Sequence, residues 1–222
     1  MKPTYILLLS VLLSTLAFEK AAAQWNVAQY GSKSNSVYTT FGLDPALVNS
    51  VGYARVIPVK GHAFQAIGEL GLATTNLDTR DYRVRLGIRT SVVHWKSLHL
   101  IGNATFLTRG TKNDIYRGFN FGADFTGEVG WYRPSWFAAA EFGKDKAVIT
   151  HVTHTDWYRD NYYPDAKDGW YLDAGGTYHF GLAGGVTVLG ADIVGRVGLR
   201  QTEQFNSINP PLYASLGVAY GF

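Results

Sequence analysis

The amino-acid sequence predicts an all-β fold, a transmembrane up-and-down antiparallel β-barrel of about ten strands. First, many stretches alternate apolar and polar residues, as strands with two different faces do. Second, no apolar run after residue 18 is long enough for a membrane helix, so a chain that spans a bilayer must close into a barrel. Third, charges recur on the polar face of nearly every stretch, which is typical of a polar interior and an apolar exterior.

The last predicted strand, residues 212–222, shows this alternation most clearly. Its apolar face consists of Ala214, Leu216, Val218, Tyr220 and Phe222, whereas the other face is small or polar. This ending resembles the C-terminal signal of bacterial outer-membrane β-barrel proteins, and Tyr220 and Phe222 are the residues that match it. The resemblance implies a bacterial cell outer membrane as the location. It also implies that the barrel-assembly machinery recognises this strand.

Residues 1–23 have the pattern of a cleaved secretory signal peptide, with Lys2, an apolar run and three alanines before Gln24. The predicted mature chain, residues 24–222, is long enough for one barrel domain. It has no cysteine, which excludes disulfides and a lipid-attachment cysteine. The mature chain has 18 basic and 16 acidic residues, which gives no argument for nucleic acid as a partner. The expected surroundings are outer-membrane lipid and lipopolysaccharide.

Turns and loops are predicted to alternate along the chain. The first two strands are expected at residues 36–43 and 47–57, with no clear assignment of their faces. Short turns are predicted at residues 58–62, 94–97, 132–135 and 181–184, and longer connections at residues 74–80, 108–116, 147–168 and 201–211. Short periplasmic turns and longer extracellular loops are typical of outer-membrane barrels.

The inward-facing charges form the first candidate site. The polar faces carry the acids Glu69, Asp124, Glu128, Glu141, Asp173 and Asp192 and the bases Arg83, Arg85, Arg89, Arg196 and Arg200. A barrel of about ten strands is narrow, so opposite charges would meet across the lumen. They would either form a salt-bridged structural interior or line a narrow pore for small solutes or ions. The sequence leaves both possibilities open.

The connection at residues 147–168 forms the second candidate site. Its β-branched start predicts a hairpin that projects beyond the membrane. The candidate binding residues are His151, His154, Trp157, Tyr158, Arg159, Tyr162 and Tyr163. Aromatic rings beside cations suit a sugar or a lipopolysaccharide phosphate, although the rings could instead pack on one another at the rim. The first functional hypothesis is therefore a structural role or the binding of a surface ligand or partner through this extracellular hairpin.

A hydrolase at the outer rim is a third hypothesis, because His151, His154 and Asp156 lie close together in sequence. Residues three apart on a strand point to opposite faces, so the histidines do not converge. No glutamate supplies the general base of a zinc protease. Ten-stranded outer-membrane proteases are similar in strand number, but they spread their catalytic groups over opposite walls. We therefore expect no catalytic residue, no metal and no cofactor, and the oligomeric state is left open.

Overall fold

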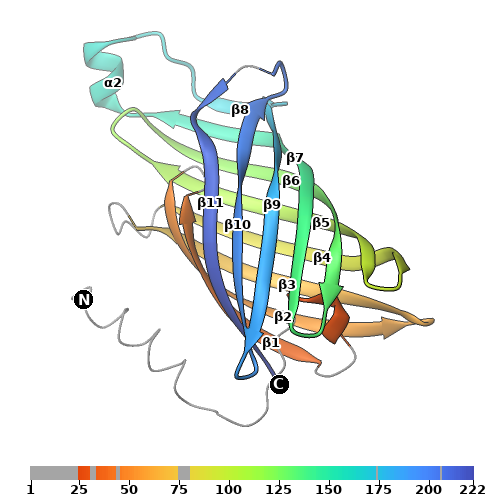
Figure 1. The fold of residues 1–222 in the computed structure, drawn as a ribbon. Helices are drawn as coiled ribbons and strands as arrows, with labels where there is room; N and C mark the ends of the chain where they lie inside the picture. Colours follow the sequence, from red (N-terminus) through yellow and green to blue (C-terminus); the bar gives the residue numbers. More distant parts are fainter. Residues whose placement is uncertain (1–24, 31–33, 44–45, 75–80, 174, 206) are drawn as a thin grey trace.

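The computed structural model describes residues 25–30, 34–43, 46–74, 81–173, 175–205 and 207–222. Ten long strands form one closed antiparallel barrel in which each strand pairs with the next along the chain (Figure 1). They are β1 (Asn35–Leu43), β2 (Leu47–Val59), β3 (His62–Ala73), β4 (Tyr82–Trp95), β5 (Leu98–Lys112), β6 (Tyr116–Arg133), β7 (Trp136–His154), β9 (Gly176–Val188), β10 (Ala191–Thr202) and β11 (Ser207–Gly221). The prediction of an all-β, up-and-down antiparallel barrel is confirmed.

Three short elements complete the fold. The 3₁₀-helix η1 (Val27–Gln29) precedes the barrel, whereas helix α2 (Asp156–Asn161) and strand β8 (Gly169–Leu172) follow β7. Strand β8 pairs with the far end of β7, beyond the part that pairs with β9. No helix within the described ranges is both long and apolar enough to cross a membrane. The predicted signal peptide, residues 1–23, lies outside the described residues.

The barrel closes where β11 pairs with β1, from Ser36 opposite Gly221 to Leu43 opposite Ala214. Phe222 extends this pairing, because its N–H donates to the Asn35 carbonyl at 2.8 Å and its carbonyl accepts from the Asn35 N–H at 3.1 Å. Tyr220 pairs with Val37 on one side and Ala191 on the other. The predicted assembly signal is therefore the strand that seals the barrel.

The two ends of the barrel differ in how their strands are joined. We call the end with Phe222 the proximal end; it also holds the short β2–β3, β4–β5, β6–β7 and β9–β10 turns. The opposite, distal end carries α2, β8 and the other connections (Figure 1). Strands β5 and β6 extend further toward the distal end than predicted, because β5 ends at Lys112 and β6 begins at Tyr116. Strand β7 continues to His154, as the β-branched start of residues 147–168 predicted.

The turn predicted at residues 181–184 is wrong, because β9 runs without interruption from Gly176 to Val188. The chain turns instead at Leu189 and Gly190, both with positive φ (51° and 83°), as a two-residue type I′ hairpin turn requires. Glycines in and beside the predicted turn have another role. A Cβ on Gly181 would lie 2.4 Å from the Tyr213 hydroxyl, and one on Gly185 would lie 2.5 Å from the Phe137 ring. These glycines make room for inward-pointing rings.

The outer and inner faces of the barrel have opposite chemistry. Large apolar side chains on the outer face are exposed on every long strand, among them Phe41, Val51, Leu70, Leu86, Phe106, Phe125, Phe142, Leu182, Ile193 and Leu216. The inner face buries charged side chains together with an apolar cluster in the proximal half. This cluster includes Val56, Ile101, Tyr132, Phe137 and Val194. The core of the protein therefore lies inside the barrel.

Candidate functional site: the barrel interior and the distal extension

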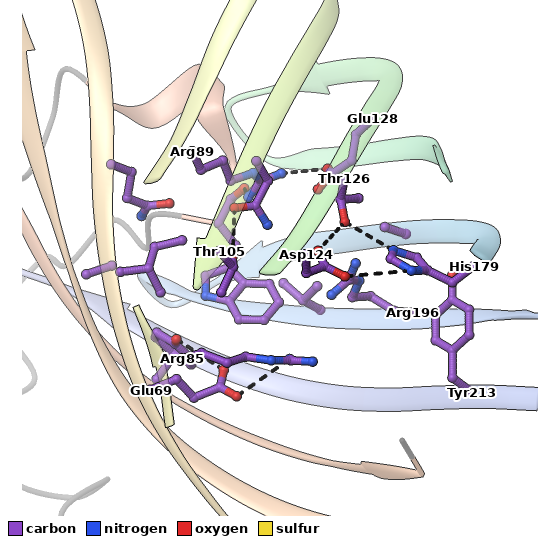
Figure 2. A pocket seen from close by; sticks show the side chains of 18 of the residues that line it. Glu69, Arg85, Arg89, Thr105, Asp124, Thr126, Glu128, His179, Arg196 and Tyr213 are labelled. Atoms are coloured by element: carbon purple, nitrogen blue, oxygen red, sulfur yellow. Dashed lines mark hydrogen bonds and ion pairs between the residues drawn. The ribbon is translucent and has the colours of Figure 1, made fainter. Parts of the chain in front are cut away.

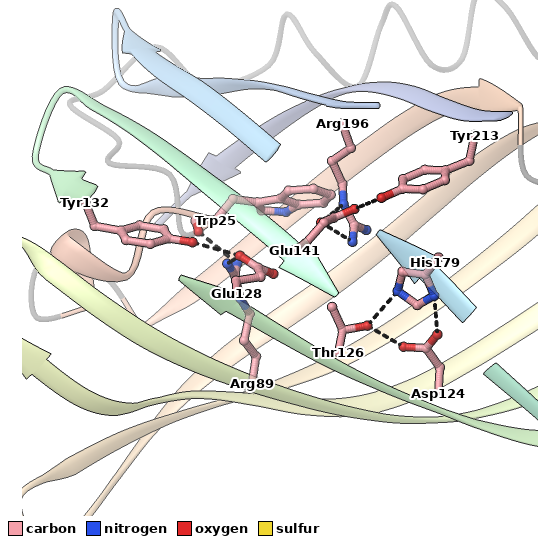
Figure 3. A network of polar contacts seen from close by, with 10 residues as sticks. All are labelled: Trp25, Arg89, Asp124, Thr126, Glu128, Tyr132, Glu141, His179, Arg196 and Tyr213. Carbon is pink, nitrogen blue, oxygen red and sulfur yellow. Dashed lines mark hydrogen bonds and ion pairs between the residues drawn. The ribbon is translucent and has the colours of Figure 1, made fainter. Parts of the chain in front are cut away.

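The charged residues of the interior form close ion pairs across the lumen. Arg89 Nη2 lies 2.6 Å from Glu128 Oε2, which also accepts a hydrogen bond from the Tyr132 hydroxyl at 2.8 Å (Figure 3). All three residues are buried. A buried carboxylate needs both a counter-ion and hydrogen bonds to compensate for lost water. Glu128 has both.

A second ion pair, between Arg196 and Glu141, has the same arrangement. Arg196 places Nε and Nη2 at 2.9 and 2.7 Å from Glu141 Oε2, and the Tyr213 hydroxyl donates to the other oxygen of Glu141 (Figure 3). Closer to the distal end, Glu69 lies 3.7 Å from Arg83 and 3.8 Å from Arg85 (Figure 2). These tyrosine partners were missed at the sequence level, although strand alternation places Tyr213 on the inward face.

Asp124, Thr126 and His179 form a polar group that could be mistaken for a catalytic triad. The Thr126 hydroxyl donates to Asp124 Oδ1 at 2.8 Å and lies 3.1 Å from His179 Nε2 (Figure 2). A hydroxyl donates a single hydrogen, so here Nε2 must be the donor toward Thr126. His179 is then no base for that hydroxyl, and the arrangement orients the ring rather than activating a nucleophile.

The remaining predicted lumen charges divide into two groups. Asp192 is buried near the proximal end and accepts a hydrogen bond from the Thr187 hydroxyl at 2.5 Å, whereas Arg200 is buried further along β10. Asp173 differs from the prediction, because it lies between β8 and β9 with a 74% exposed side chain that pairs with Lys146. Its backbone has a positive φ of 54°, so strand alternation does not apply there.

Two inward charges were missed. Arg109 and Asp145 lie on the inner faces of β5 and β7, opposite Arg83 and Asp124 respectively. Continuing the alternation from Glu141 through Gly143 would have identified Asp145. With them, the described interior contains six arginines and six carboxylates: Arg83, Arg85, Arg89, Arg109, Arg196 and Arg200 with Glu69, Asp124, Glu128, Glu141, Asp145 and Asp192. The charges of the lumen are therefore balanced.

The lumen is filled at its proximal end but not throughout. Residues 25–30 lie inside the barrel there, and Asn26, Val27, Gln29 and Tyr30 are buried. No alternation pattern marks this segment, so it was not predicted. Between it and the distal half lies a cavity of about 140 Å³ lined by Trp25, Glu69, Arg85, Asp124 and Arg196, among others (Figure 2). A cavity of this size with polar walls can hold several water molecules.

The second candidate site projects from the distal end. We call residues 149–172, which include the end of β7, α2 and β8, the distal extension (Figure 1). A bulge precedes it, because Gly122 pairs with Ala147 and Phe121 with Ile149, which leaves Val148 as an extra residue. The bulge reverses the alternation. Thr150 therefore reaches Asn120 at 2.6 Å.

The two histidines of the extension do not converge. His151 packs on Trp170 with ring centroids 4.7 Å apart, whereas His154 stacks on Tyr158 and contacts Asp168. The side chain of Asp156 is 97% exposed, and its ion-pair partner is Arg159 at 3.7 Å. The structure therefore does not bring His151, His154 and Asp156 together. Within the described ranges, no three or more His, Cys, Asp or Glu side chains are grouped so that they could hold a metal ion.

Asp168 connects the end of β7 to α2 within the extension. Its Oδ1 accepts from the backbone N–H of His154 at 2.8 Å, and its Oδ2 lies 2.5 Å from Arg159 Nη2. The His154 N–H and the Arg159 guanidinium lower the pKa of Asp168 to about 2. At the start of α2, Thr155 caps the helix by accepting from the Tyr158 N–H at 3.2 Å. Thr155 also donates to the Asp114 carbonyl, so the extension is held to the β5–β6 connection.

The aromatic residues of the extension contact one another and still remain exposed. Trp157 and Tyr162 have ring centroids 5.2 Å apart, and Tyr158 and Tyr162 stack at 6.0 Å. Nevertheless Trp157 is 51% and Tyr162 67% exposed. Tyr163, Trp170 and Tyr171 are exposed as well. Packing at the rim therefore accounts for the arrangement of these rings but leaves much of their surface uncovered.

No protein-family model matches the sequence, and no curated protein matches it.

Proposed function

We propose that the chain is an integral protein of a bacterial outer membrane and that its distal extension binds a ligand at the cell surface. The observation that carries the membrane location is the inverted polarity of the barrel. Its outer face exposes Phe41, Leu86, Phe125 and similar side chains on all sides, whereas its inner face carries six arginines and six carboxylates. An exposed apolar surface of that extent marks a membrane or protein interface, and a lipid-facing band is what a membrane barrel needs.

Two features of the extension support a binding role. The hydrogen bonds of Asp168 and Thr155 hold the extension in one conformation, so little entropy is lost when a ligand binds. The exposed rings of Trp157, Tyr162, Tyr163, Trp170 and Tyr171 provide apolar surface beside polar atoms. Aromatic residues of this kind are enriched at binding sites because one ring offers a large contact area with few rotatable bonds.

A sugar suits this surface better than a phosphate. Residues 155–168 contain four aspartates and only two basic residues, Arg159 and Lys167. Arg159 is already engaged by Asp168 at 2.5 Å and Asp156 at 3.7 Å. A phosphate would therefore meet more negative than positive charge, whereas a neutral sugar can stack on the rings. The proposed ligand is the carbohydrate part of a cell-surface molecule.

Binding is tested with the polysaccharide released from lipopolysaccharide as the probe. We expect Trp157→Ala to weaken binding by about tenfold or more, as the loss of a central aromatic contact does. Trp95→Ala is the matched control, because Trp95 is also exposed, at 70%, but lies at the proximal end. Equal binding by the two variants would exclude the extension as the site.

The location is tested separately, by cysteine labelling. The chain contains no cysteine, so Asp160→Cys and Ser135→Cys each introduce a single thiol at an exposed position, one distal and one in the β6–β7 turn. A membrane-impermeant maleimide should label the Asp160→Cys variant on intact cells. The Ser135→Cys variant should react only after the outer membrane is permeabilised. The reverse result would contradict the proposed orientation.

A further inference from the structure

The N-terminal segment of the described chain, residues 25–30, occupies the proximal lumen although it belongs to no strand. Its contacts come from around the barrel wall. The Trp25 ring meets Tyr38 of β1 edge to face at 5.3 Å, the Trp25 carbonyl accepts from Arg89 of β4 at 2.9 Å, and the Tyr30 hydroxyl donates to Gln65 of β3 at 3.1 Å. The segment therefore links β1 to the paired strands β3 and β4, neither of which pairs with β1.

The segment also caps the proximal turn between β6 and β7. The Asn26 side-chain amide donates to the Arg133 carbonyl, and the Gln29 amide donates to the Pro134 carbonyl and, at 2.8 Å, to the Thr187 hydroxyl. Val27 and Tyr30 belong to the apolar cluster that includes Tyr132 and Phe137. Side chains of the segment thus close the proximal end of the lumen.

None of these contacts belongs to the barrel ladder. All ten long strands pair with their neighbours without residues 25–30, so the wall can remain closed when the segment leaves. If the signal peptide is removed as predicted, the mature chain begins at Gln24, one residue before Trp25. A segment at the end of a chain can then leave the lumen without threading a loop through it. Trp25 also lines the luminal cavity, so departure of the segment joins that cavity to the proximal solvent.

We propose that residues 25–30 are a plug and that its withdrawal opens a narrow, weakly selective channel through the barrel. This inference rests on the membrane location given under the proposed function, but not on ligand binding by the extension. The weak selectivity follows from the lumen charges, since the six arginines and six carboxylates named above leave no net sign to favour cations or anions.

The direct test is conductance in a planar lipid bilayer. The refolded mature chain is compared with a variant that lacks residues 25–30, after a heat-dependent gel shift has shown that each forms a barrel. We expect few or no openings from the intact chain and reproducible conductance steps from the shortened one, with similar permeability to potassium and chloride. A folded but silent shortened barrel would overturn the proposal, because the lumen would then be closed without the plug.

A reversible lock separates plug movement from a general loosening of the barrel. The paired substitutions Trp25→Ala and Tyr30→Ala weaken the plug and should increase openings. Adding Gln29→Cys and Thr187→Cys, whose native side chains are in contact, should suppress those openings under oxidising conditions and restore them with a reductant. The control pair is Val37→Cys and Tyr53→Cys, which lie directly opposite each other on β1 and β2.

The control disulfide should leave the openings unchanged. Openings that persist in the oxidised Gln29–Thr187 variant would contradict a moving plug. The cysteine labelling of the extension reports the membrane orientation independently. Correct labelling with a silent shortened barrel would therefore reject the plug alone and leave the proposed location intact.

Discussion

Two aromatic pairs, one at the proximal end of β6 and β7 and one beyond their distal end, have similar ring separations but opposite surroundings. At the proximal end, the rings of Tyr132 and Phe137 stack at 5.1 Å and are 2% and 4% exposed. Beyond the distal end, Trp157 and Tyr162 lie at a similar 5.2 Å but remain mostly exposed. A ring contact alone therefore does not distinguish structure from function. The exposed surface left after packing does, because only uncovered rings can bind a partner.

The same contrast holds for charges. In the lumen, Glu128 and Glu141 are enclosed by arginines and tyrosine hydroxyls that satisfy them. In the extension, Asp156 points into solvent and its contact with Arg159 is long at 3.7 Å. The charges of these luminal carboxylates are thus compensated within the protein, whereas that of Asp156 is left to solvent.

The largest difference in the free energy of unfolding is expected between two variants that each lose one ring, one at the proximal end and one in the distal extension. Phe137→Ala removes a buried ring and should lower the free energy of unfolding by about 3–5 kcal/mol. Trp157→Ala should change it by less than about 0.5 kcal/mol, as for an ordinary surface residue. Urea unfolding of the barrels refolded in lipid vesicles measures both values. Similar losses for the two variants would show that the extension is part of the folding core.

A comparable loss is expected when one partner of a buried ion pair is removed. Glu128→Ala should lower the free energy of unfolding by about 3–5 kcal/mol, because it leaves the Arg89 guanidinium buried without its carboxylate. Replacing both residues, with Arg89→Met and Glu128→Leu, should recover much of that loss. The same urea titration checks this, and a double variant no more stable than Glu128→Ala would show that the hydrogen bonds to Tyr132 and Trp25 matter more than the ion pair itself.

A smaller loss of stability is expected when a glycine beside an inward-pointing ring is replaced by alanine. Gly181→Ala would bring a Cβ within 2.3 Å of the Val197 carbonyl and 2.4 Å of the Tyr213 hydroxyl. The wall must shift, at a cost of about 1–3 kcal/mol. At Gly195, a Cβ would meet nothing within 4 Å, so Gly195→Ala serves as the control. Equal unfolding midpoints for the two variants would contradict this assignment.

The smallest effect on the stability of the whole protein is expected when low pH protonates Asp168 in the extension. Because the folded-state pKa of Asp168 is lowered from 3.8 to about 2, its contribution is fully present above about pH 4. That contribution is lost as the pH falls through about 2. The near-ultraviolet circular dichroism signal of the extension rings should therefore weaken as the pH falls below about 4. Asp168→Asn should already show the weakened signal at pH 7.

Most of the barrel could be predicted because its alternation follows from a simple rule. Successive side chains of a strand point to opposite faces, so the faces of residues 82–90 or 212–222 follow from their order alone. The rule fails where the backbone departs from a regular strand. The bulge at Val148 and the positive φ of Asp173 change which side chains face inward, and neither leaves a distinct mark in the sequence.

The sequence by itself determined the fold class, the closing strand and, except for the first two strands, which face is apolar, since these depend only on local order and on the need to pair every strand. The tertiary structure alone decided what fills the lumen and which side chains meet. Residues 25–30 enter the barrel because the strands around them leave an apolar space near Phe137 and carbonyls of the β6–β7 turn to be hydrogen-bonded. Asp168, rather than Asp156, reaches His154 because α2 folds the chain back. Such long-range contacts depend on the closed geometry of the whole barrel, which no single stretch of sequence contains.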